Sequence, residues 1–171
     1  MTRPTKAAMT HGTGYGQSTA LDLQSKFPEA ISNWREFRGD WQITVRADRL
    51  RDVAFHLRDT LGYQMLSSMS GVDFYPDEPR FKVVYMLTHM TEKTQFLFEA
   101  VTSGENPELP TLSDIWMVAN WQEREVYDFF GIKFTNHPDL RRALMPEDFE
   151  GYPLRKDFPL LGVDVGLKAR S

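Results

Sequence analysis

Charged side chains that could carry acid–base chemistry are concentrated between Trp121 and Leu160. Within a predicted helix, Glu125 and Asp128 share one face, while Glu123 and Arg124 lie on the neighbouring face. Three interpretations of this pattern stay open. The acids could act as general acids and bases, they could form an ordinary solvated helix face, or they could form a charged contact face for another subunit.

Two further charged blocks follow, HPDLRR at 137–142 and PLRKD at 153–157. Arg141, Arg142, Arg155 and Lys156 could bind phosphate or nucleic acid. Interleaved acids weaken that interpretation and favour ion pairing across an interface; they are Asp139, Glu147, Asp148, Glu150 and Asp157.

Several classes of site have no support in the sequence. The chain has no cysteine, so it has no disulfide, no thiolate ligand for zinc and no standard iron–sulfur ligation. The four histidines form no HxH or HExxH pair, and no GxGxxG or GxxxxGK[ST] loop is present. A net charge of −4 gives no general attraction to nucleic acid. No apolar run approaches the roughly 18 residues of a membrane span.

The rest of the chain predicts the elements that must position these residues. Helices are expected at 19–27 and at 48–61, where Asp48 could cap an apolar stripe and His56 lies off that stripe as a surface or edge residue. A third helix runs from a cap at Ser113 to Gly131, with a break near Asn120. Strands are expected at 34–37 and 41–45, joined by a turn at Arg38-Gly39-Asp40, and at 63–74, 80–89 and 94–102.

This order predicts an α+β fold. We expect a two-layer domain with a mixed, mostly antiparallel five-stranded sheet and helices on one face, followed by a helix and an extended C-terminal tail. The expected divisions are a flexible tail at 1–18, the α+β domain at 19–102, a loop and helix carrying the Glu-Arg-Glu motif at 103–131, and an extended segment at 132–171 that contacts other subunits. Prolines at 138, 146, 153 and 159 disfavour long helices in that last segment.

The charged blocks resemble a known family, the 30 kDa (C) subunit of respiratory complex I, the proton-translocating NADH:quinone oxidoreductase. The resemblance is carried by three ordered blocks and by the upstream SDIW at 113–116 and ANW at 119–121. The blocks are Glu123-Arg124-Glu125 with Asp128 and Phe130-Gly131-Ile132, then His137-Pro138-Asp139-Leu140-Arg141-Arg142, then Gly151 with Pro153-Leu154-Arg155-Lys156-Asp157 and Pro159-Leu160.

The resemblance implies a structural subunit of the peripheral arm with no catalytic residue and no cofactor of its own. FMN and iron–sulfur clusters would be carried by partner subunits, which pass electrons from NADH to quinone in a reaction coupled to proton translocation. The expected partners are the 49 kDa-type quinone-site subunit and cluster-bearing subunits, on the cytoplasmic side of the cell membrane. The motif residues are then assigned to contacts within the chain or between subunits: Glu123, Arg124, Glu125, Asp128, His137, Asp139, Arg141, Arg142, Arg155, Lys156 and Asp157.

Two alternatives remain open from the sequence. The chain could be the equivalent subunit of a related assembly, such as a membrane-bound hydrogenase or a ferredoxin- or F420H2-dependent dehydrogenase. It could also be a stand-alone acid–base enzyme that uses Glu125, Asp128 and His137, which requires a concave pocket at those residues.

Overall fold

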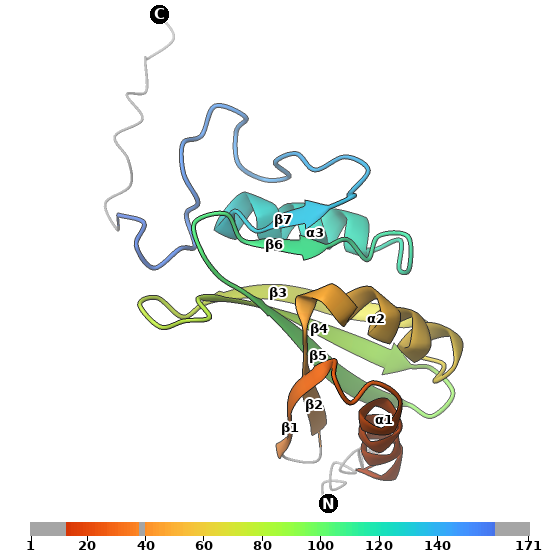
Figure 1. Ribbon diagram of the computed structural model, residues 1–171. Coiled ribbons are helices and arrows are strands. Elements are labelled where there is room, and N and C mark those ends of the chain that lie inside the picture. The colour runs from red at the N-terminus through yellow and green to blue at the C-terminus, as the bar shows by residue number, and fades with distance from the viewer. Residues whose placement is uncertain (1–12, 38–39, 160–171) are drawn as a thin grey trace, which may run out of the picture.

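A five-stranded sheet is the central element of the computed structural model, which describes residues 13–37 and 40–159 (Figure 1). The strands lie in the order β1-β2-β5-β4-β3, and every neighbouring pair is antiparallel except β2 with β5. The mixed, mostly antiparallel α+β fold predicted from the sequence is confirmed. The strands are β1 (Ile31–Phe37), β2 (Asp40–Val45), β3 (Met65–Asp73), β4 (Phe81–His89) and β5 (Thr94–Thr102).

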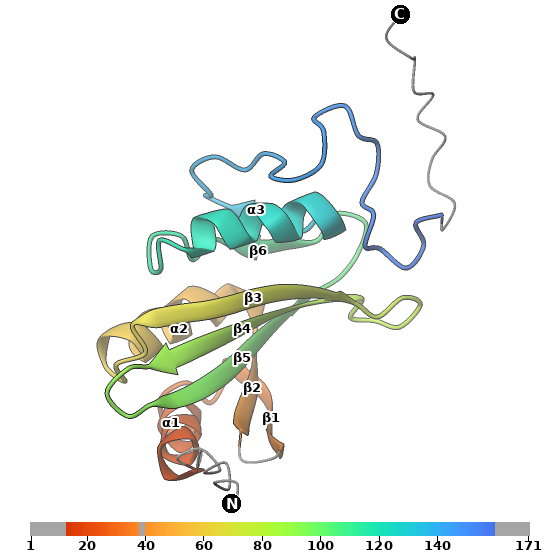
Figure 2. The same ribbon diagram turned by 180° about the vertical axis from the view of Figure 1, so that it is seen from behind.

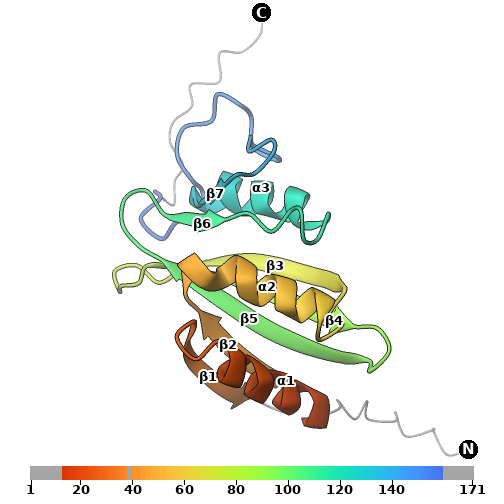
Figure 3. The same cartoon turned by 45° about the vertical axis from the view of Figure 1, so that its right-hand side comes forward.

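One face of the sheet carries the hydrophobic core, because apolar residues alternate along its strands. In β4, Phe81, Val83, Tyr85 and Leu87 are all fully buried. Helices α1 (Thr13–Lys26) and α2 (Leu50–Asp59) lie on this face, in front of the sheet in Figure 3, whereas Figure 2 views the sheet from behind, with α2 beyond it. The two helices cover part of this core, and residues of the segment 109–116 and of the helix at 119–130 complete it.

Helix α3 (Ala119–Phe130) lies along the edge strand β3. Gly71 makes this approach possible, since a Cβ there would lie 2.6 Å from the Phe130 ring. Gly131, with φ of 71°, ends the helix in the left-handed conformation, as the sequence predicts. A short parallel pair, β6 (Glu108–Pro110) with β7 (Lys133–Thr135), joins the segments before and after α3, and the sequence did not predict it.

Some local expectations were wrong. The first helix begins at Thr13 and not at 19, and Asp48 makes no capping bond, because a 3-10 turn, η1 (Ala47–Arg49), precedes α2. Ser113 does not cap α3, since residues 113–118 form turns and the helix begins only at Ala119. The predicted hairpin of β1 and β2 is confirmed, but Arg38 and Gly39 of its turn lie outside the described residues.

His56 was also misplaced by the sequence interpretation. It is buried between α2 and α1, where its Nε2 lies 2.6 Å from Asp22 and its Nδ1 lies 3.1 Å from the Lys26 amine. The sequence interpretation assumed that α2 buries a single apolar face. It missed this contact because α1 covers a second side of α2.

After β7 the described chain runs without helix or strand across α3, β6 and β7 (Figure 1). Among the described residues, no helix is both long enough and apolar enough to cross a membrane.

Candidate functional site around helix α3

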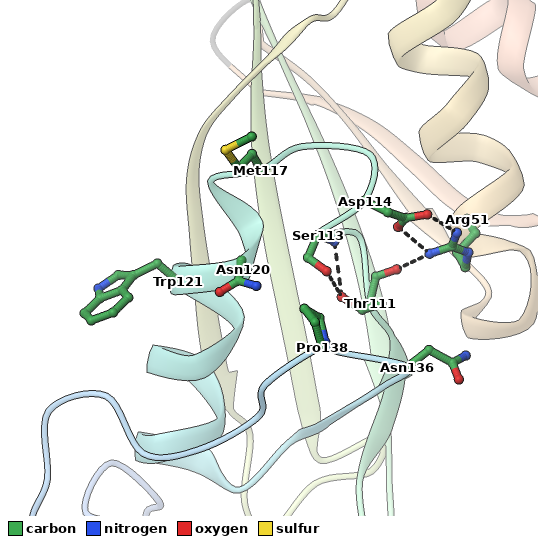
Figure 4. Close-up of a pocket in the computed structure, with 9 residues that line it drawn as sticks. All are labelled: Arg51, Thr111, Ser113, Asp114, Met117, Asn120, Trp121, Asn136 and Pro138. Carbon is green, nitrogen blue, oxygen red and sulfur yellow. Dashed lines mark hydrogen bonds and ion pairs between the residues drawn. The ribbon is translucent and has the colours of Figure 1, made fainter.

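An open pocket of about 610 Å³ lies where α2, the turns before α3 and the loop after β7 meet (Figure 4). Its lining mixes polar and apolar side chains, and Met117, Trp121 and Pro138 are among the apolar ones. In Figure 4, Asn120 points towards the pocket, whereas Trp121 points away from the Arg51 end. The lining residues are Arg51, Thr111, Ser113, Asp114, Met117, Asn120, Trp121, Asn136 and Pro138.

A two-point ion pair fixes one end of the pocket. Arg51 Nη1 lies 2.8 Å from Asp114 Oδ1, and Nη2 lies 2.6 Å from Oδ2 (Figure 4). Arg51 Nη1 also donates to the Thr111 carbonyl at 2.6 Å. These hydrogen bonds from Arg51 lower the pKa of Asp114 below its ordinary value. The pair therefore fastens α2 to the turns that lead into α3.

Glu123 lies beneath the pocket and is fully buried. Its Oε1 accepts the Leu112 amide at 2.7 Å, and its Oε2 is hydrogen-bonded to the Thr111 hydroxyl, which in turn contacts Ser113. Burial raises the pKa of Glu123 to about 7, because these hydrogen bonds do not fully replace the lost hydration. The interpretation of this residue as part of a solvated helix face was therefore wrong.

Both ring nitrogens of His137 make contacts within the chain. Its Nδ1 accepts the Asp139 amide at 3.0 Å, and its Nε2 lies 3.0 Å from the Asn120 carbonyl. Nε2 also lies 3.9 Å from Glu123. His137 thus ties the loop after β7 to the first turn of α3.

Arg124 joins the same loop to the outer side of α3. It is only 8% exposed and donates to the carbonyls of Arg141 at 3.2 Å and Arg142 at 3.0 Å. Its guanidinium also stacks over the Trp121 ring, 4.6 Å from the ring centre. Arg124 thus holds both the loop and the indole in place.

Asp128 is the main anchor of the C-terminal segment. Its Oδ2 accepts the amides of Ala143, Leu144 and Met145 at 3.0, 2.7 and 2.8 Å, and its Oδ1 accepts Arg142 Nη1 at 2.8 Å. Burial alone would raise the pKa of Asp128, but these donors outweigh it and hold the pKa below its ordinary value. One fully buried carboxylate therefore organises a loop that has no regular hydrogen bonding of its own.

A second buried carboxylate, Asp73 at the end of β3, holds the chain further on. It accepts two bonds from Arg80, each at 2.9 Å, and the Lys156 amide at 2.8 Å. Arg80 also pairs with Asp157 at 2.7 Å. Nearby, Arg155 donates to the carbonyl of Phe130 at 2.6 Å. Asp73 and Arg80 are not among the motif residues that the sequence assigned to contacts.

The structure thus separates the eleven motif residues into two groups. Six have buried or half-buried side chains and make contacts within the chain: Glu123, Arg124, Asp128, His137, Arg142 and Arg155. The other five are exposed: Glu125, Asp139, Arg141, Lys156 and Asp157. Of these, Arg141 pairs with Asp139 at 2.9 Å, and Asp157 pairs with Arg80.

Glu125, Asp128 and His137 do not converge on one reacting position. Glu125 is exposed, Asp128 uses both oxygens to hold the loop, and both nitrogens of His137 are engaged. Within residues 13–37 and 40–159, no three His, Asp or Glu side chains are grouped so that they could hold a metal ion.

Comparisons with known proteins agree on one family. The family model described as "Respiratory-chain NADH dehydrogenase, 30 Kd subunit" matches residues 43–163. A protein of Roseiflexus castenholzii, named as the C subunit of NADH-quinone oxidoreductase, is 48% identical over 145 residues, which cover 84% of this chain and 83% of that protein. The protein of the same name from Salinispora tropica is 43% identical over 172 residues, which cover 97% of this chain and 70% of that protein.

Two solved structures share the fold. A trypsin-resistant fragment of Nqo5 is 31% identical with a TM-score of 0.62, and the match covers 71% of this chain and 98% of the fragment. A chain of the membrane-bound sulfane sulfur reductase, an archaeal respiratory membrane complex, is 26% identical with a TM-score of 0.74. This match covers 85% of the present chain and 86% of that chain.

Proposed function

Since the chain belongs to the family of the 30 kDa subunit of respiratory-chain NADH dehydrogenase, we propose that it serves its complex by joining other subunits and not by carrying electrons. The chain is a subunit of an NADH:quinone oxidoreductase, as its relatives are named. Other subunits of that complex are therefore its partners.

The observation that supports this role is how the motif charges are used. Four motif residues use their polar atoms in hydrogen bonds that hold residues 136–145 against α3. They are Arg124, Asp128, His137 and Arg142. A catalytic group needs a free polar atom facing a substrate, whereas these groups face the chain itself. Their arrangement fits a rigid surface that other subunits can bind.

The electron carriers belong on the partners in this proposal. The chain has no cysteine to bind an iron–sulfur cluster, and the FMN and clusters of the complex would sit on neighbouring subunits. We expect the 49 kDa-type quinone-site subunit and cluster-bearing subunits to be in direct contact with this chain, on the cytoplasmic side of the membrane.

A tagged chain, purified in mild detergent from its native membranes, tests the proposal. Mass spectrometry should identify flavin- and cluster-bearing subunits of an NADH:quinone oxidoreductase in the same particle, and the purified chain alone should not oxidise NADH. A chain that is recovered without other subunits, or one that oxidises NADH alone, contradicts the proposal.

A related assembly is the second candidate, because the chain of the archaeal sulfane sulfur reductase complex has the same fold at 26% identity. The same purification separates the two candidates. Hydrogenase-type subunits, or a particle without an NADH-binding subunit, would favour a membrane-bound hydrogenase or a ferredoxin- or F420H2-dependent dehydrogenase.

A further inference from the structure

A second, smaller hollow of about 160 Å³ opens between α3, the edge strand β3 and the C-terminal segment, and it shares no lining residue with the pocket of Figure 4. Met69 and Gly71 line it from β3, and Leu154 lines it from the C-terminal segment. Its two polar lining residues, Ser70 and Glu125, are both exposed. In Figure 2, the C-terminal segment passes the end of α3 and comes down towards the end of β3. The hollow is therefore mainly apolar, with one carboxylate at its rim.

The apolar wall of the hollow is held in position by the backbone. Leu154 is 52% exposed, but its amide donates to the Phe129 carbonyl at 3.2 Å. The next residue, Arg155, donates from Nε to the Phe130 carbonyl at 2.6 Å. These two bonds fix the C-terminal segment beside the last turn of α3. Association loses less conformational entropy when the site is already formed, so this wall favours binding.

The charge of the hollow is negative. Glu125 is the one charged residue among those that line it, and it forms no ion pair within residues 13–37 and 40–159. The neighbouring charges on α3 are engaged elsewhere, since Arg124 donates to loop carbonyls and Asp128 is paired with Arg142. Lys156 is exposed, but it does not line the hollow. A cationic group from outside would therefore supply the opposite charge that Glu125 lacks.

An apolar hollow with a carboxylate at its rim matches a long basic side chain. Lysine and arginine bury their methylene stems along apolar surfaces and keep the charged end at a polar edge. An arginine can also pair with a carboxylate through two parallel hydrogen bonds. An acidic side chain would be repelled by Glu125, and a purely apolar one would cover the carboxylate without pairing it.

We propose that this hollow is the docking site for an arginine or lysine side chain of another subunit. The stem of that side chain lies against Leu154 and Phe129, and its cationic end pairs with Glu125. This inference rests on the proposed role as a subunit and adds where one partner binds and what it must carry.

The test uses the intact complex, purified from native membranes through a tag on this chain. Glu125→Lys places a cation against the incoming cation, so we expect the yield of co-purified subunits to fall about tenfold or more. Glu92, an exposed acid at the turn between β4 and β5, supplies the matched control, and Glu92→Lys should retain all subunits. Circular dichroism of each purified chain checks that it folds.

A photo-crosslink identifies the partner residue. With p-benzoyl-phenylalanine in place of Ser70, irradiation of the complex should join this chain to another subunit at a peptide that carries Arg or Lys. Replacing that basic residue with Glu should then restore the subunits to the Glu125→Lys complex.

Three results overturn the inference while leaving the proposed function intact. They are a Glu125→Lys complex that keeps all its subunits, a crosslinked peptide without Arg or Lys, and a charge exchange that restores nothing. A crosslink between two copies of this chain overturns it too. A wild-type chain recovered without any subunit refutes the proposed function as well.

Discussion

Replacing Glu123 with Gln should stabilise the protein at alkaline pH and leave it unchanged in mild acid. Glu123 is fully buried, and burial raises its pKa from 4.5 to about 7. A neutral Gln can still accept the Leu112 amide through its oxygen and donate to the Thr111 hydroxyl through its amide. It therefore reproduces the contacts of the protonated acid without its ability to ionise.

The sign and size of the effect follow from this pKa. Because the folded state binds the Glu123 proton more tightly than the unfolded state, the contribution of Glu123 to stability is greatest below pH 4.5 and falls as the pH rises to about 7. A shift of about 2.5 pK units corresponds to about 3 kcal/mol. Glu123→Gln lacks this loss, so it should exceed the wild type by about 3 kcal/mol at pH 8 and match it only below about pH 4.

Urea unfolding followed by tryptophan fluorescence at several pH values measures the difference. Glu125→Gln is the matched control, because it makes the same chemical change at an exposed position two residues away and should follow the wild type at every pH. If Glu123→Gln is less stable than the wild type at pH 8, the buried carboxylate is ionised and stabilising, and the reasoning is wrong.

Three further predictions concern the anchors of the C-terminal segment. Asp128→Asn should destabilise residues 143–145 by about 3 kcal/mol, because three amides and an arginine would then donate to a neutral acceptor. Amide hydrogen exchange at these residues should become at least tenfold faster. Unchanged exchange rates would contradict the role of Asp128 as an anchor. Burial would raise the pKa of Asp73, but its hydrogen-bond donors hold this pKa at about 2. In urea titrations, Asp73→Asn should therefore be less stable than the wild type above about pH 4, and the difference should shrink as the pH falls towards 2. Gly131→Ala should lower the free energy of unfolding by about 1–3 kcal/mol, and with it the melting temperature, because φ is 71° and the new Cβ would lie within 2.6 Å of the Tyr152 ring. An unchanged melting temperature would show that the ring moves freely.

The sheet could be predicted because its signal is local. Phe81, Val83, Tyr85 and Leu87 alternate with less buried residues, and this period of two is set by strand geometry whatever the partner strand. The pair β6 and β7 carries no such signal. Each strand has three residues and only one buried side chain, so their pairing depends on α3 bringing distant segments together.

The membership of α3 in the core is harder to predict for a different reason. Helical periodicity marks apolar faces, and a charged residue inside a face lowers the signal. Glu123, Arg124 and Asp128 are buried because loops, and not apolar side chains, cover them. Spacing alone left a solvated face open for these residues, whereas the family resemblance assigned them to contacts. Whether the exposed motif residues Glu125 and Lys156 contact other subunits remains a prediction.

The C-terminal segment explains why charges and aromatics are mixed in the sequence. Between β7 and Pro159 the segment has no helix or strand to satisfy its amides, and prolines prevent either from forming. A single buried carboxylate can satisfy several of these amides, since Asp128 alone accepts three consecutive ones. The carboxylate must then be neutralised, and Arg142 does so while its guanidinium lies 5.7 Å from the Phe149 ring centre. Anchoring a loop in this way requires an acid, an arginine and an aromatic together, and that combination is the pattern that the sequence shows.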